Sequence, residues 1–183
     1  MARRDALREL HARLAERLQA VQSTTQRSAW LAVECEGQGL LFPLTTAGEI
    51  FSVPTMLPVP HTQPWFVGVA NLRGGLHGVA DLGAFLGLRG PHPAGEPWPE
   101  ASRVLALNPT LGSHAALIVD RLAGLRSPTQ MTARPPADGP RPTFAGEAWS
   151  DETGRSWLEL NLAALASHPL FLGIAASAPR QTP

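Results

Sequence analysis

The sequence contains no lysine and no tyrosine, and all fifteen of its basic residues are arginine. Without lysine the chain cannot contain a Walker A phosphate loop, a lysine Schiff base or the S-x-x-K motif of serine hydrolases. Charged residues make up only 16% of the chain, against roughly 25% in typical soluble domains. Because fifteen acidic residues balance the fifteen arginines, no overall field draws the chain to nucleic acid or to an anionic membrane.

Cysteine and long apolar segments are equally scarce. Cys35 is the only cysteine, which excludes a disulfide framework and a cysteine-based zinc site. The flanking Glu34 and Glu36 disfavour a thiolate, so we interpret Cys35 as a buried structural thiol rather than a nucleophile. The longest apolar run, residues 65–70, is far shorter than the roughly 18 residues of a membrane span. Because the first residues also lack the apolar core of a signal peptide, we expect a cytoplasmic protein without membrane insertion.

The chain of 183 residues is long enough for one domain with its own core. Residues 1–24 predict an amphipathic helix that runs into a polar linker. Apolar residues recur there every three or four positions, at Leu7, Leu10, Leu14, Leu18 and Val21. This pattern fits a helix packed on its own domain as well as one that docks on a partner or pairs with a second copy. We expect the main domain over residues 25–175 and a short tail over residues 176–183.

From Trp30 onward the apolar period changes to two, which indicates β-strands. In the first strand Val33 and Cys35 face one way and Glu34 and Glu36 the other, which predicts a strand buried on one face only. Similar runs follow at residues 40–44, 49–53, 65–73, 79–82, 103–107, 115–120 and 157–160. Many short strands without long helices predict an all-β sandwich or barrel, with helical turns at residues 82–86 and 162–166.

Two proline-rich segments interrupt this pattern and cannot form central strands. We interpret the first, residues 90–100, as part of a connection between two halves of the domain, near residues 88–101. The second, residues 127–143, is interpreted as a long surface loop.

No residue pattern in the chain points to catalysis. His77 and Asp81 share one face of a strand, but four residues of strand separate them by roughly 13 Å, whereas an acid–base pair needs about 3 Å. The six histidines are scattered without a metal-binding spacing, and the glycines of residues 68–78 do not form a phosphate-binding motif. We therefore expect no enzyme, no cofactor and no metal. A small hydrolase that uses His77, Asp81 and either Ser102 or Ser113 is a disfavoured alternative.

Asn71 and Arg73, in contrast, are polar residues at the end of an otherwise apolar strand. An arginine at the rim of a core requires an acceptor, because burying a guanidinium without one costs several kcal/mol. Glu49 and Asp81 are the candidate acceptors. The arrangement is either a turn residue beside a solvated arginine or a rim ion pair that shapes a docking surface.

Three segments carry a family resemblance: LPVP (57–60), WFVGVANLRG (65–74) and GVADLGAFLG (78–87). Together with Glu49 upstream and three strand-like segments downstream, they resemble the CheW-like adaptor domain of bacterial chemosensory systems over residues 30–171. The leucine-lined N-terminal segment is more similar to the PilI branch, which serves type IV pilus systems, than to the flagellar branch. The chain departs from the family pattern at His77, Gly78 and Asn161, where an apolar residue, proline and aspartate are usual.

The resemblance implies an all-β fold of two small five-stranded SH3-like β-barrels that share an apolar core. It also implies a non-catalytic adaptor that couples a CheA-type histidine kinase, through its regulatory domain, to the cytoplasmic tip of a methyl-accepting receptor. The receptor's helical hairpin would lie in the groove between the barrels. The partner-binding residues it implies are the pair Glu49 and Arg73, then Asn71, Leu72 and Gly74 beside it, Asp81 at the following turn, and Val119 and Asp120 at the equivalent edge of the second barrel.

A binding barrel outside chemosensing, for single-stranded nucleic acid or another protein, is the main alternative. Nucleic-acid binding needs a basic groove with stacking aromatics, which the zero net charge and five scattered tryptophans disfavour. A family member that binds a receptor but no kinase, or the reverse, would have the same sequence features.

Overall fold

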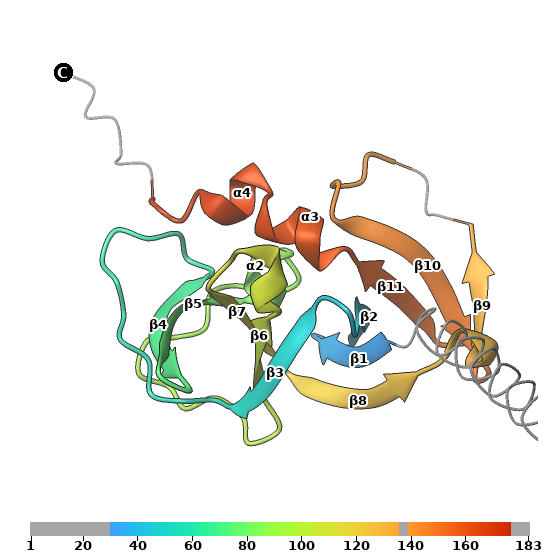
Figure 1. The fold of residues 1–183 in the computed structure, drawn as a ribbon, viewed down its shortest axis with the longest axis horizontal. Helices are drawn as coiled ribbons and strands as arrows, with labels where there is room; N and C mark the ends of the chain where they lie inside the picture. Colours follow the sequence, from blue (N-terminus) through green and yellow to red (C-terminus); the bar gives the residue numbers. More distant parts are fainter. Residues whose placement is uncertain (1–29, 136–138, 177–183) are drawn as a thin grey trace, which may run out of the picture.

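The computed structural model describes residues 30–135 and 139–176, which form two β-sheets with few helices (Figure 1). The predicted N-terminal helix (residues 1–24) and most of the predicted tail lie outside the described residues. The first sheet has the strand order β8 (Arg121–Arg126), β1 (Trp30–Cys35), β2 (Gln38–Pro43), β11 (Ser156–Leu160), β10 (Ala145–Asp151), β9 (Met131–Arg134). The second has the order β3 (Ala47–Ser52), β6 (Arg103–Leu107), β7 (Ala115–Val119), β5 (Gly75–Asp81), β4 (Phe66–Leu72). The sequence predicted an all-β class, and the described residues are mostly β, with two sheets and a few short helices.

The two sheets divide the chain unevenly. β1 and β2 begin the six-stranded sheet, β3 to β7 build the whole five-stranded sheet, and β8 to β11 return to the first. Two pairings are parallel, β2 with β11 and β5 with β7. The expectation of five strands in each half was wrong for the first sheet, which has six. Among the described residues, the strand pairings leave β8 and β9 at the edges of one sheet and β3 and β4 at the edges of the other, so barrel closure stays a prediction.

Both proline-rich segments differ from our interpretation. Residues 88–101 follow β5 and precede β6, and both strands belong to the five-stranded sheet, so this segment does not connect the two halves. The chain crosses between the sheets at residues 44–46 and at Asp120 instead. Residues 127–143 are not all loop, because they contain a 3-10 turn, η2 (Pro128–Gln130), and strand β9. β9 is an edge strand, a position where neighbouring prolines are tolerated.

Short helices follow two of the strands, as predicted. α2 (Leu82–Phe85) and α3 (Leu162–Ala166) begin directly after capping residues that end β5 and follow β11. Asn161 accepts a hydrogen bond from the Ala164 N–H at 3.0 Å, so this departure from the family pattern preserves the cap. Three helical elements were not predicted: α4 (Pro169–Leu172) and the 3-10 turns η1 (Pro109–Leu111) and η2.

The largest apolar cluster lies between the sheets and takes residues from both, which confirms the shared core. Leu40 and Phe42 of β2 enter it from one sheet, and Leu105 and Leu117 of β6 and β7 from the other. Each sheet also covers a smaller cluster of its own.

Strand β1 faces two of these clusters, so the prediction that it is buried on one face only was wrong. Val33 and Cys35 point into the shared core, while Trp30 and Ala32 join the smaller cluster of the six-stranded sheet. The alternation read from the sequence is correct, but every residue of β1 is buried.

Candidate partner-binding site

The sharp turn between β4 and β5 carries most of the predicted partner-binding residues. Leu72 pairs with Gly75 across the turn, and the two residues between them, Arg73 and Gly74, have φ angles of 50° and 86°. This is the backbone of a two-residue hairpin with both φ angles positive, which glycine adopts without strain. Asn71 closes the turn, because its Oδ1 accepts a hydrogen bond from the Gly74 N–H at 2.7 Å. We call residues 71–75 the hairpin.

The hairpin presents three of its residues to solvent. Asn71, Arg73 and Gly74 are exposed, whereas Leu72 is buried. Leu72 therefore anchors the hairpin in the core of the five-stranded sheet, and its contact with a partner stays a prediction.

Arg73 forms its ion pair with Glu49 and not with Asp81. Arg73 Nε lies 2.8 Å from Glu49 Oε2, and the two side chains are 76% and 53% exposed. Glu49 lies on β3 and Arg73 follows β4, the strands at opposite edges of the sheet order, so the sheet curls until its edges approach each other. An ion pair this exposed contributes only about 0–1 kcal/mol to stability. It is a surface feature, available to a partner.

Asp81 is buried and forms an ion pair with Arg89, an arginine that was not recognised from the sequence. Asp81 is 1% exposed, caps α2 through Ala84 N–H, and accepts hydrogen bonds from Arg89 Nε at 3.0 Å and Nη2 at 2.7 Å. Arg89 also binds Asp120 and Glu36. We call these four charged residues the Arg89 cluster. The Asp81 carboxylate is therefore buried and hydrogen-bonded inside the molecule, and its contact with a partner stays a prediction.

The Arg89 cluster ties the two sheets together. Asp120 stands where the chain crosses between them, and it also accepts the Glu36 N–H of the β1–β2 turn at 2.7 Å. Burial by itself lowers the pKa of Arg89, but hydrogen bonds with Asp81, Asp120 and Glu36 outweigh it and raise that pKa above its ordinary value. Asp120 is thus partly engaged inside the molecule. The neighbouring Val119 is fully buried, and its role at a binding edge stays a prediction.

A second buried carboxylate lies in the six-stranded sheet. Glu34 of β1 is held by Arg155 Nη1 at 2.6 Å and by Arg121 Nη2 at 2.7 Å. The hydrogen bond from Arg155 lowers the pKa of Glu34, and this effect exceeds the raising effect of burial. The residue that was expected on an exposed strand face is therefore an internal, ionised group.

An aromatic groove of about 590 Å³ opens where segments of both halves meet. Trp65, which precedes β4, stacks on Phe171 of α4 at 5.7 Å between ring centres and meets Phe85 of α2 edge-on at 5.1 Å. Phe144, before β10, and the exposed Leu170 also line the groove. Figure 1 shows α3 and α4 running along the side of the molecule that also holds α2.

The residues considered for catalysis are not brought together. His77 Nδ1 contacts the Gly75 carbonyl at 3.0 Å, and Asp81 is occupied by Arg89, so they form no acid–base pair. Burial raises the pKa of Cys35 to about 12, which keeps it a thiol. Within residues 30–135 and 139–176, no three histidine, cysteine, aspartate or glutamate side chains cluster closely enough to hold a metal ion.

The described residues form a fold of two β-sheets around a shared core. The crystal structure of the scaffolding protein TtCheW from Thermoanaerobacter tengcongensis shares it, with a TM-score of 0.59 at 18% identity over 73% of this chain and 84% of that one. Residues 29–170 match the CheW-like domain. Protein PilI of Pseudomonas aeruginosa is 31% identical over 166 residues, 89% of each chain. The chain therefore belongs to the CheW-like domain family.

Proposed function

We propose that this protein is a non-catalytic adaptor that couples methyl-accepting receptors to a CheA-type histidine kinase. The match of residues 29–170 to the CheW-like domain carries this proposal. Similarity to PilI over 89% of both chains favours a type IV pilus system and the control of twitching motility over flagellar chemotaxis. In this account each sheet closes into a small barrel, and the protein works at receptor arrays on the cytoplasmic side of the membrane.

The hairpin is the surface we assign to the kinase regulatory domain. It is the exposed end of the five-stranded sheet, and Glu49 and Arg73 offer one charge of each sign there. Exposed Ile50 and Leu76 follow on the adjoining strands, at 41% and 63% exposure. A charged pair beside exposed apolar side chains is typical of a protein interface with a polar rim.

The aromatic groove is the surface we assign to the receptor's helical hairpin, because a helix with an apolar face fits a groove lined by aromatic rings. The two assigned surfaces do not overlap. β5 has seven residues, with the hairpin at its first residue and α2 directly after its last, which separates the surfaces by about 20 Å.

The test is binding of the regulatory region of a CheA-type kinase from the same organism, measured by size-exclusion chromatography with light scattering. We expect a one-to-one complex that Arg73→Glu weakens at least about tenfold, because the substitution places two negative charges side by side in the interface. Arg134→Glu is the matched control, since Arg134 is exposed on β9 of the other sheet. Equal binding by a folded Arg73→Glu variant would remove the hairpin from the interface. Absence of binding by the wild type to every such kinase would refute the adaptor function.

A further inference from the structure

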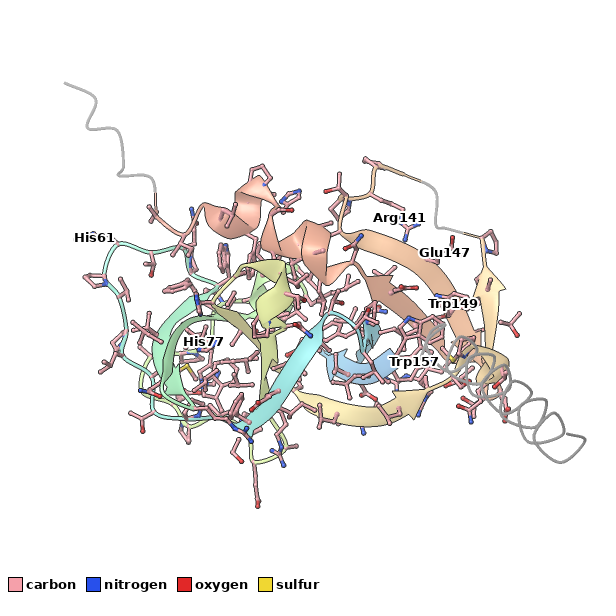
Figure 2. All side chains as sticks on the ribbon, in the orientation of Figure 1. His61, His77, Arg141, Glu147, Trp149 and Trp157 are labelled. Atoms are coloured by element: carbon pink, nitrogen blue, oxygen red, sulfur yellow. The ribbon has the colours of Figure 1, made fainter. Side chains whose placement is uncertain are left out.

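Two histidines far apart in the sequence, His77 and His114, become neighbours on the five-stranded sheet. β5 and β7 run parallel with Gly78 opposite Ala115, and the Gly78 N–H donates to the His114 carbonyl at 2.9 Å. His77 and His114 therefore precede paired positions on adjacent chain segments. Their ring centres are 5.7 Å apart and the ring planes meet at 72°. Figure 2 labels His77 on this sheet, well away from His61 on the long loop before β4.

The orientation of the His77 ring is fixed by the hairpin. Its Nδ1 lies 3.0 Å from the Gly75 carbonyl oxygen, which can only accept, so Nδ1 carries the proton and Nε2 carries the lone pair. The ring fits there because Gly75 has no side chain: a Cβ at this position would lie 3.1 Å from His77 Cε1. A histidine that donates one ring nitrogen to a backbone carbonyl and keeps the other free is the usual form of a metal ligand.

The spacing of the two rings suits a shared ion. If each ring bound one ion through a nitrogen at about 2.0–2.1 Å, the ring centres would lie roughly 5 Å apart at tetrahedral or octahedral angles. The observed separation of the ring centres is 5.7 Å. A small rotation of the His114 side chain, which is exposed, would bring the two rings to the ion-binding separation. The ring planes need not be parallel, since each nitrogen coordinates along its own ring plane.

We propose that His77 and His114 form a two-ligand binding site for a divalent transition-metal ion. Imidazole ligands suit copper, zinc and nickel and disfavour Mg²⁺ and Ca²⁺, which prefer oxygen. The order of affinities for such ligands makes Cu²⁺ bind more tightly than Zn²⁺ or Ni²⁺. The remaining coordination positions are open to water or to a group from another molecule. The site does not depend on the adaptor function, so either can fail without the other.

Calorimetric titration of the full chain without an affinity tag, at mildly alkaline pH where imidazole is neutral, tests the site. We expect one Cu²⁺ to bind, Zn²⁺ to bind more weakly, and Mg²⁺ to give no signal. His114→Ala should weaken Cu²⁺ binding at least about tenfold, the lower end of the loss seen when even an outer partner of a metal ligand is removed. His114 is exposed, so this variant keeps its fold. Gly75→Ala should also weaken binding, because the added methyl group displaces the His77 ring.

His61→Ala is the matched control, since His61 is an exposed histidine outside the pair, and it should bind Cu²⁺ like the wild type. Electron paramagnetic resonance of the Cu²⁺ complex supplies a second readout, with hyperfine coupling to two imidazole nitrogens. The proposal is overturned if the wild type binds no Cu²⁺, or if His77→Ala and His114→Ala both bind it with wild-type affinity.

Discussion

Arg89 is the central residue of the charged cluster at the junction of the two sheets. Its guanidinium is the partner of Asp81, a carboxylate that is 1% exposed, and it holds Asp120 and Glu36 at the junction of the two sheets. Removing one member of a buried pair leaves the other charged and desolvated, which is more costly than losing the pair's attraction. By contrast, Arg73 lies in an exposed pair whose loss leaves both groups in water.

We therefore expect Arg89→Met to destabilise the fold by about 3–5 kcal/mol, while Arg73→Met costs about 0–1 kcal/mol. Urea denaturation followed by circular dichroism measures both on the same scale. Similar losses for the two variants would contradict the assignment of Arg89 as the buried and Arg73 as the surface arginine.

Glu34 makes the stability of the fold depend on pH. Its pKa is lowered in the folded protein, chiefly by the hydrogen bond from Arg155, so ionised Glu34 stabilises the native state at neutral pH. A lowered pKa means that this contribution is present above the ordinary pKa of a glutamate and is lost as the pH falls through the lowered value.

Glu34→Gln should accordingly be less stable than the wild type at neutral pH, with the difference shrinking as the pH falls into the acid range. Thermal unfolding across the acid range measures this. Glu147→Gln, at an exposed position of β10, is the control and should follow the wild type. If the difference in stability between Glu34→Gln and the wild type does not change with pH, the arginine partners do not lower the pKa of Glu34.

At the scale of elements, the apolar periodicity of the sequence predicted those helices and strands that their own residues determine. The helical turn predicted at residues 162–166 has the bounds of α3, because Asn161 caps a run of alanine and leucine. The strands β1 and β6 were also found, the first from its alternation and the second from its short apolar run. β8, β9 and β10 were missed, because β8 is interrupted by an irregularity near Gly124, β9 lies among prolines and β10 contains small and polar residues.

The pairings between elements could not be predicted from sequence. Nothing in the sequence marks Arg89 as the partner of Asp120, which lies 31 residues away. Nothing in it marks His77 as the neighbour of His114 either. Both contacts depend on the parallel pairing of β5 with β7. The hairpin, in contrast, is local. Its Asn71 and Arg73 were found from the sequence alone, since polar residues at the end of an apolar strand stand out against their neighbours.

Helix α4 is the element whose surface we assign to the receptor. Leu170 is 69% exposed at the rim of the aromatic groove, so Leu170→Glu should keep the fold while weakening binding of a receptor-tip fragment at least about tenfold, because a charge would be buried against an apolar helix face. Leu125→Glu is the matched control, with 62% exposure on β8. Fluorescence anisotropy of a labelled receptor fragment measures both. Equal losses in the two variants, or none, would place the receptor elsewhere.

At the scale of the whole molecule, the chain order makes the two halves interdependent. The six-stranded sheet is completed only when β8 to β11 return to β1 and β2, after the five-stranded sheet has been built between them. Because both sheets share one core, the hairpin and the groove lie on one folded unit, at opposite ends of β5. An adaptor needs this arrangement, since it must hold two partners at the same time.

The most direct test of that account is to mix the protein with both the kinase regulatory region and the receptor-tip fragment and to measure the mass of the product by size-exclusion chromatography with light scattering. We predict one complex that contains all three components, from which Arg73→Glu releases only the kinase and Leu170→Glu only the receptor. Two binary complexes that exclude each other, or no complex with either partner, would contradict the claim that this protein couples receptor to kinase.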